Sequence, residues 1–308
     1  MTAGPVRETG IVKLLRQRGP LTGAELRTLL GNDGFALWKT CKLSEHIEIR
    51  RVGRRYLRLD RRVQGYARLS PSIWREFLTY TVVGLAEDPV TLAERTEELA
   101  ARIKAISAQK FRLAERTVSQ ACSRFLSHEG QEEGRFCVLL AGDIVYEMAH
   151  DAPRPERSTG HMVRGSDLDL VFLLNDAAPS ELREQLDEAI YQQKYRLLIN
   201  PSVREEIDYA IKPLARVKEQ ASFDTFENMV ACKILDEAVL LYGSRSLYEA
   251  AKGLLAERGI PEKLAEMEAQ ALVAREQVEK LLLGQTEQAL RAEDLHLFYP
   301  SEESEEFE

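Results

Sequence analysis

The sequence predicts an α+β protein in which many helices accompany a few short β-strands. Apolar residues recur at helical spacing over most of the 308 residues. Short apolar runs of strand length are confined to the middle of the chain. We expect five parts: helices with a hairpin over 1–68, a helical connector over 69–131, the sheet core over 132–220, further helices over 221–297, and an acidic disordered tail over 298–308.

The first part contains three short helical segments. Residues 8–18 have an apolar face and are followed by a Gly-Pro pair that ends the helix. Thr22 and Glu25 then form a capping-box pattern at the start of a second helix, which Gly31 ends. A third helix is expected over residues 35–43.

Two alternating segments follow, at 47–51 and 55–59, and the glycine between them indicates a β-hairpin. Three helices and a hairpin resemble the winged helix-turn-helix, a fold used mostly to bind DNA. That resemblance makes the third helix the recognition helix and the hairpin the wing. The candidate nucleic-acid contacts are then Lys39, Lys42, Arg50, Arg51, Arg54 and Arg55.

Charge is distributed unevenly along the chain. Residues 1–68 contain fifteen Lys and Arg against six Asp and Glu, whereas the whole chain has a net charge of −8. A basic segment on an acidic protein is typical of a module that contacts nucleic acid phosphates. The alternatives are a basic face that is only solvated, and a winged helix that binds a protein partner.

Three apolar runs predict the strands of the core, beginning near Phe136, Asp167 and Glu206, with a helix at about 179–198 between the last two. Asp167 and Asp169 are two residues apart, so in a strand their side chains point to the same face. At about 4 Å, two such charges repel by roughly 4 kcal/mol at an effective dielectric of about 20. A hard divalent cation such as Mg²⁺ or Mn²⁺ removes this repulsion. Asp208 supplies a third carboxylate from another strand.

The segments Leu140-Ala-Gly-Asp-Ile and Arg164-Gly-Ser-Asp-Leu-Asp-Leu-Val-Phe resemble the signature of the DNA polymerase β-type nucleotidyltransferase superfamily. Residues 234–244 are similar to the helix that ends in a Leu-Tyr-Gly turn in many members. The resemblance covers about 136–245 and implies a small mixed sheet with helices on one side. It implies a nucleoside triphosphate and Mg²⁺ as ligands, and transfer of a nucleotidyl group to a hydroxyl or phosphate. Asp167, Asp169 and Asp208 would be the catalytic metal ligands, and the nucleotide-binding candidates are Gly142, Asp143, Ser166 and Lys233.

Two departures from the family pattern affect this prediction. Asp143 stands where the family has serine, and a carboxylate repels phosphate. The insertion between Asp143 and Asp167 is long and polar, so it is either an active-site flap or a plain surface loop. As a flap it would bring Arg154, Arg157 or Arg164 to the missing phosphate contact. His161 is interpreted as a loop residue.

Several basic and aromatic residues follow the third carboxylate. Lys212, Arg216 and Lys218 are each either triphosphate contacts or solvated surface cations. Tyr242 is expected to pack rather than to stack on a base. Three classes of function therefore remain open: an active nucleotidyltransferase, a DNA-binding regulator with a nucleotide-sensing or degenerate domain, and an interaction protein without catalysis.

The four cysteines, at 41, 122, 137 and 232, are widely spaced in apolar contexts. This spacing predicts reduced, mostly buried thiols rather than a zinc site or a disulfide framework. No apolar run reaches the length of a membrane span or of a signal peptide. We therefore expect a cytoplasmic protein without a membrane partner.

Overall fold

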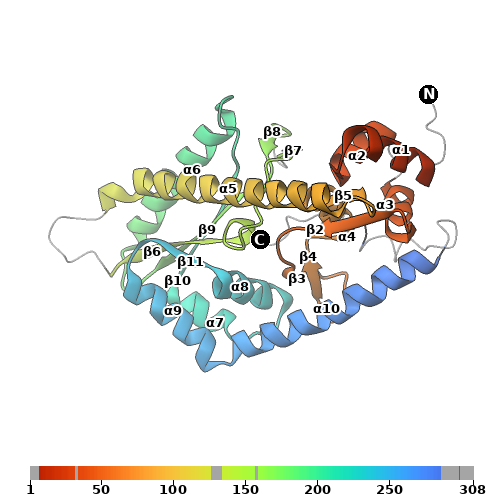
Figure 1. Ribbon diagram of the computed structural model, residues 1–308. Helices are drawn as coiled ribbons and strands as arrows, with labels where there is room; N and C mark the ends of the chain where they lie inside the picture. Colours follow the sequence, from red (N-terminus) through yellow and green to blue (C-terminus); the bar gives the residue numbers. More distant parts are fainter. Residues whose placement is uncertain (1–6, 32–33, 126–133, 157–158, 286–297, 299–308) are drawn as a thin grey trace. The chain divides into compact units, whose positions relative to one another are not determined.

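The computed structural model describes residues 7–31, 34–125, 134–156, 159–285 and 298 (Figure 1). Its elements confirm an α+β protein with several small sheets. The chain divides into two compact units, one of Met1–Arg102 with Met267–Glu303 and one of Ile103–Glu266 with Ser304–Glu308. The boundary expected at residue 68 falls inside the first unit. The acidic tail expected over 298–308 lies outside the described residues except for residue 298.

The helices expected at the start of the first unit are confirmed. They are α1 (Glu8–Arg18), α2 (Gly23–Leu30) and α3 (Gly34–Leu43). Thr22 and Glu25 form the complete capping box at the start of α2. Because these helices turn apolar faces inward, they share one core with α4 (Ile73–Thr79) and with the end of α10 (Ile260–Gly284).

The expected hairpin between residues 47–51 and 55–59 is wrong. Strand β2 (Ile47–Arg51) pairs with β5 (Thr81–Leu85), which also pairs with β1 (Leu21–Thr22), so the sheet order is β1-β5-β2. Strand β3 (Tyr56–Leu59) pairs instead with β4 (Ala67–Ser70). Strand β5 takes the place of β3 beside β2 because its Val82 and Val83 are fully buried, which suits the central position of a sheet. The expectation of continuous helix over 69–131 is wrong at β4 and β5.

The second unit is built on one four-stranded sheet with the order β10-β9-β6-β11. Its strands are β6 (Phe136–Ala141), β9 (Leu168–Leu174), β10 (Ile207–Pro213) and β11 (Val239–Gly243). The predicted mixed sheet is confirmed, because β9 and β10 are parallel and the other two pairs are antiparallel. Strand β11 corrects the prediction of continuous helix after residue 220.

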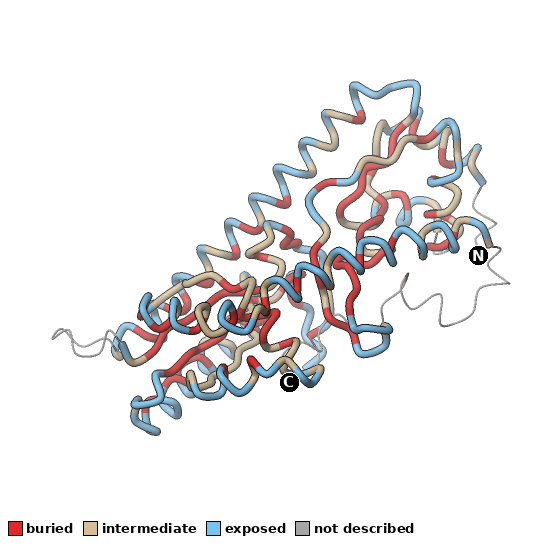
Figure 2. The backbone as a smooth tube through the Cα atoms, turned by 90° about the horizontal axis from the view of Figure 1, so that it is seen from below, coloured by how far each residue is buried: buried red, intermediate tan, exposed pale blue. Residues whose placement is uncertain are grey.

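One face of this sheet packs on α5 (Pro89–Cys122) and α6 (Ser180–Ile199), and together they form the core of the unit. Figure 2 shows helical stretches in which buried residues alternate with exposed ones, as expected for amphipathic helices. The unit also contains α7 (Leu214–Gln220), α8 (Phe226–Glu237), α9 (Arg245–Glu257) and the beginning of α10. The polar insertion forms a small hairpin of β7 (Pro153–Pro155) and β8 (Met162–Arg164).

All four cysteines are free and buried, which confirms the expectation of reduced interior thiols. Burial raises the pKa of three of them, Cys41, Cys122 and Cys137, to about 12, so these thiols are protonated near neutral pH. Within the described part of the chain, no helix combines the length and apolar character needed to cross a membrane.

Candidate metal centre

Three carboxylates meet at one end of the parallel strand pair. Asp208 on β10 lies directly opposite Asp169 on β9, and Asp167 immediately precedes β9. One ligand oxygen from each lies within 4.8 Å of the others. The two-residue spacing predicted the shared face of Asp167 and Asp169, and Asp208 was expected as a third carboxylate from another strand. The side chains of Asp167 and Asp208 are only 17% and 24% exposed.

Gly142 makes room for this cluster. It follows β6 with φ of +74°, a conformation that favours glycine. A Cβ at this position would lie 2.0 Å from Oδ2 of Asp169. The tight turn that the sequence predicted therefore presses the backbone against a carboxylate, and any side chain here would displace Asp169.

The β7–β8 hairpin brings Arg154 to the carboxylates. Its Nη2 forms ion pairs with Asp167 and, at 2.8 Å, with Glu206, while its Nε donates a hydrogen bond to the Gly165 carbonyl. Burial raises the pKa of Glu206, although the charge of Arg154 opposes the rise. Among the three arginines considered for the insertion, Arg154 reaches the site, Arg164 is exposed, and Arg157 lies outside the described residues.

A second cation approaches from α6, where Nζ of Lys194 lies 3.2 Å from Oδ1 of Asp208. Asp167 and Glu206 thus share the guanidinium of Arg154, and Asp208 pairs with Lys194. Sequence analysis missed Lys194 and Glu206, although Glu206 precedes Asp208 by two residues and is expected on the same face of the strand.

Asp143 and Ser166 contact each other. The hydroxyl of Ser166 donates a hydrogen bond of 2.8 Å to Oδ2 of Asp143, and the backbone N–H of His150 donates to the same hydroxyl. These two candidates from separate motifs therefore meet, although 23 positions separate them.

Lys233 lies near the Gly142 turn rather than in solvent. Its ammonium pairs at 2.8 Å with Glu237, and both side chains are almost fully buried. Glu237 in turn accepts a hydrogen bond of 3.1 Å from the backbone N–H of Gly142. The backbone N–H of Gly142, a candidate phosphate contact, therefore donates to Glu237. The sequence did not predict this role of Glu237.

Lys110 on α5 fixes the segment that leads into β9. Its ammonium, with the side chain only 4% exposed, donates to the carbonyls of Arg164 and Ser166 at 2.7 and 2.8 Å. It also forms an ion pair with the buried Glu205. All three N–H donors of the Lys110 ammonium therefore have acceptors. Lys110 thereby fixes the backbone segment that precedes Asp167.

The remaining candidates of this unit lie away from the carboxylates or pack in the core. Tyr242 stacks on Phe136 with ring centroids 6.3 Å apart, as expected for a packing residue. His161 is exposed on the insertion hairpin, consistent with a loop role. Lys218 is exposed on α7, whereas Lys212 lines a cavity described below.

The candidate nucleic-acid residues of the first unit fall into two groups. Lys42 and Arg54 are exposed, and Arg51 is 42% exposed although it lies 3.6 Å from Glu76. Arg50 pairs with Glu48 at 2.7 Å, and the ammonium of Lys39 donates to the carbonyl of Gln285.

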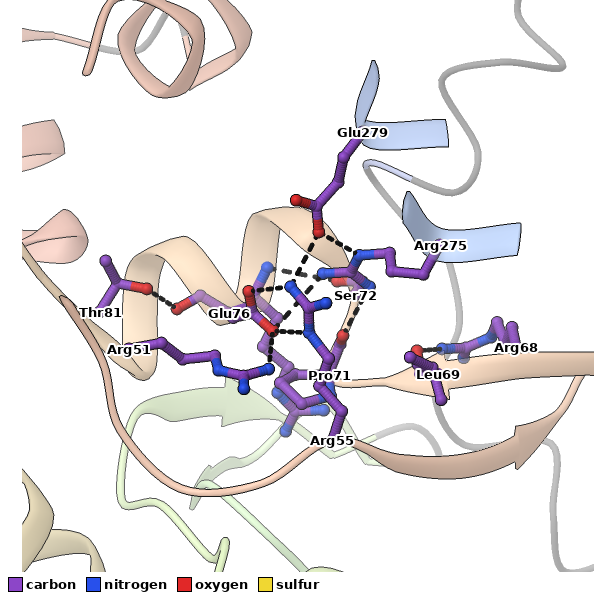
Figure 3. A network of polar contacts seen from close by, with 11 residues as sticks. Arg51, Arg55, Arg68, Leu69, Pro71, Ser72, Glu76, Thr81, Arg275 and Glu279 are labelled. Atoms are coloured by element: carbon purple, nitrogen blue, oxygen red, sulfur yellow. Dashed lines mark hydrogen bonds and ion pairs between the residues drawn. The ribbon is translucent and has the colours of Figure 1, made fainter. Parts of the chain in front are cut away.

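Arg55 belongs to an interior network instead of a free surface (Figure 3). Its guanidinium pairs with Glu76 at 2.6 Å and with Glu279 at 2.8 Å, and Arg275 pairs with the same two carboxylates. Burial opposes ionisation of Glu76, but the hydrogen bond from Arg55 and the charge of Arg275 keep its pKa below the usual value. The structure therefore gives Arg55 a structural role in tying α4 to α10.

The oxygen ligands of the triad fit a hard divalent cation. Oxygens on opposite sides of Mg²⁺ are about 4.2 Å apart, so a small side-chain movement brings the three carboxylates to one ion. The close approach of the Gly142 backbone to Asp169 favours the same chemistry. No family model of known proteins matches the chain, and neither does any curated protein.

Proposed function

We propose that the second unit is a nucleotidyltransferase that depends on Mg²⁺ or Mn²⁺ and moves a nucleoside monophosphate from a nucleoside triphosphate to an acceptor. The meeting of Asp167, Asp169 and Asp208 on adjacent parallel strands carries this proposal. The sequence resemblance to DNA polymerase β-type enzymes rests on the same residues. Phosphoryl transfer is the chemistry that most often employs such carboxylate-held divalent ions.

In this proposal Asp167 and Asp169 would hold the metal, and Asp208 would add a ligand and accept the proton of the attacking hydroxyl. When bound, the ion would offset charge on the triphosphate and on the leaving pyrophosphate. Arg154, which pairs with Asp167 and Glu206, would be the residue of the insertion that contacts a phosphate oxygen through its planar guanidinium. This role replaces the contact that serine would make at the position of Asp143.

The first unit is proposed to bind nucleic acid or a protein partner through a winged helix. The sheet order β1-β5-β2 behind three helices supports this reading, as do the exposed cations Lys42, Arg51 and Arg54. Nucleic-acid binding through these groups should weaken steeply with salt. Replacing Arg51 and Arg54 by Gln should make the affinity depend less steeply on salt concentration. An affinity that does not change with salt would rule out this role.

A second candidate function is a DNA-binding regulator whose transferase-like unit senses a nucleotide or no longer catalyses transfer. The contact between Glu237 and the N–H of Gly142 favours it, because a phosphate would need that donor. Asp143 adds a further negative charge at the adjacent position.

Transfer of label decides between the two candidates. Each α-labelled nucleoside triphosphate is incubated with the protein, Mg²⁺ or Mn²⁺, and a cell lysate separated into protein, RNA and small-molecule fractions. We expect label in one fraction, and its loss in the Asp167→Ala/Asp169→Ala double variant. Glu184→Gln, which alters an exposed carboxylate on α6, is the matched control and should keep full transfer.

Absence of transfer with every nucleotide would reject the enzyme. Retained transfer in the double variant would reject the assigned metal ligands. In the first case, stabilisation of the protein by a triphosphate would favour the regulator, since a sensing unit must still bind nucleotide.

A further inference from the structure

The second unit contains a cavity of about 600 Å³ that the metal centre does not use. Its floor is formed by Val171 of β9 and Ala210 of β10, which lie opposite each other in the sheet. Helices α7 and α8 form its walls, with Ile234 among the apolar lining residues. A concave, mostly apolar site with a few polar groups is the usual form of a small-molecule site.

Three cations line this cavity: Arg183 of α6, Lys212 of β10 and Arg216 of α7. The lining carboxylates are Glu219 and Glu227, of which Glu219 pairs with Arg216 at 2.8 Å on the exposed rim. Exposed pairs of this kind contribute little and exchange readily. The cavity therefore presents a net positive lining on an apolar background, which suits an anion.

Lys212 is the cation best placed for a ligand. Its ammonium donates one hydrogen bond of 2.9 Å to the side-chain amide of Gln220, and within the described part of the chain no carboxylate pairs with it. Burial, with a smaller contribution from Arg216, lowers the pKa of Lys212 to about 8, although the nearby Cys232 opposes the shift. Two of its three donors remain open to a bound group.

The cavity is separate from the metal centre. Lys212 follows Asp208 by four residues on β10, which corresponds to about 13 Å along a strand. Both side chains point to the same face of the sheet. The carboxylates of the metal centre and Lys212 therefore lie at different points of this face, and none of these carboxylates lines the cavity.

We propose that this cavity is a second ligand site, for a small organic anion with one phosphate or carboxylate group on an apolar body. Lys212 binds the anionic group, Arg183 and Arg216 add charge at the rim, and the apolar body lies against Val171, Ala210 and Ile234. The proposal does not depend on nucleotidyl transfer, because none of the lining residues belongs to the metal centre.

Phenyl phosphate is a suitable probe, because it combines an apolar ring with a phosphate. Binding is measured by titration calorimetry on the full chain in EDTA, so that no divalent ion recruits the probe to the carboxylates. We expect one phenyl phosphate per chain, bound more tightly than inorganic phosphate or benzyl alcohol. Lys212→Met should weaken binding about 10- to 100-fold, the usual effect of losing one charged hydrogen bond.

Lys218→Met, on the exposed side of α7, is the matched control and should bind like the wild type. Asp167→Asn/Asp169→Asn should also bind like the wild type, which separates this site from the metal centre. Circular dichroism verifies that each variant is folded.

The pH dependence provides an independent readout. Phenyl phosphate keeps its charge above pH 7, whereas Lys212 loses its proton around pH 8. Affinity should therefore fall between pH 7 and 9.5 in the wild type and stay nearly constant in Lys212→Arg, since arginine remains charged. Absence of saturable binding, or equal affinity in wild type and Lys212→Met, would overturn the proposal.

Discussion

Lys110→Met tests whether one buried ammonium holds the approach to β9. The substitution leaves Glu205 buried without its ion-pair partner and removes the donor to two carbonyls. Breaking such a buried pair costs about 3–5 kcal/mol. Lys104→Met on the same helix is the control: its ion pair with Glu147 spans 3.9 Å between side chains 72% and 62% exposed, so its loss should cost about 0–1 kcal/mol.

The assay is urea unfolding at pH 7, followed by two signals. Far-ultraviolet circular dichroism reports helices of the whole chain, whereas both tryptophans, Trp38 and Trp74, belong to the first unit. We expect Lys110→Met to lower the urea midpoint of the second unit, which circular dichroism detects. The midpoint detected by the tryptophans of the first unit should not change. The double variant Lys110→Met/Glu205→Gln should recover part of the lost stability, because no buried charge is left unpaired.

Equal unfolding midpoints for Lys110→Met and Lys104→Met would refute this reasoning. A double variant less stable than Lys110→Met would contradict it as well, since the unpaired charge of Glu205 would then not be the cost.

Three further predictions concern the metal centre and the acid stability of the first unit. Gly142→Ala should weaken Mn²⁺ binding at least about tenfold by electron paramagnetic resonance, because its Cβ would displace Asp169; unchanged affinity would contradict the cradle. Arg154→Met should tighten Mn²⁺ binding about tenfold in the same assay, since a competing cation is lost; weaker binding would contradict that competition. Burial opposes ionisation of Asp60, but hydrogen bonds from Arg62 lower its pKa from 3.8 to about 2. Its stabilisation is therefore complete above pH 4 and lost as pH falls towards 2, and tryptophan-detected unfolding of Asp60→Asn should lack this loss.

Local signals in the sequence predicted the elements whose structure depends on local interactions. The capping box of Thr22, the helix of α1 and the apolar strand β6 all formed where expected. Strands β5 and β11 were missed because each is five residues long and follows a helix, so a short apolar run does not distinguish strand from helix.

At the candidate metal centre, too, the sequence predicted local relations and missed contacts between distant residues. The two-residue spacing of Asp167 and Asp169 was sufficient to predict a shared face. Contacts over long sequence separations were not predictable: Glu237 meets Gly142, and Glu205 meets Lys110, each across 95 positions. Arg154 was one of three arginines of the insertion considered as phosphate contacts. The sequence alone did not show that the β7–β8 hairpin brings Arg154 to the carboxylates.

Phe298 has a consequence for how the protein is made. Its side chain is fully buried against Phe35 and Trp38 near the beginning of the chain, and its carbonyl accepts a hydrogen bond from the N–H of Trp74. A ribosome releases the N-terminal residues long before it adds residue 298. The aromatic core of the first unit therefore cannot close until residue 298 has left the ribosome, long after Phe35 and Trp38 have emerged. A chain that stops before residue 298 lacks the ring contacts of Phe298 with Phe35, Trp38 and Trp74.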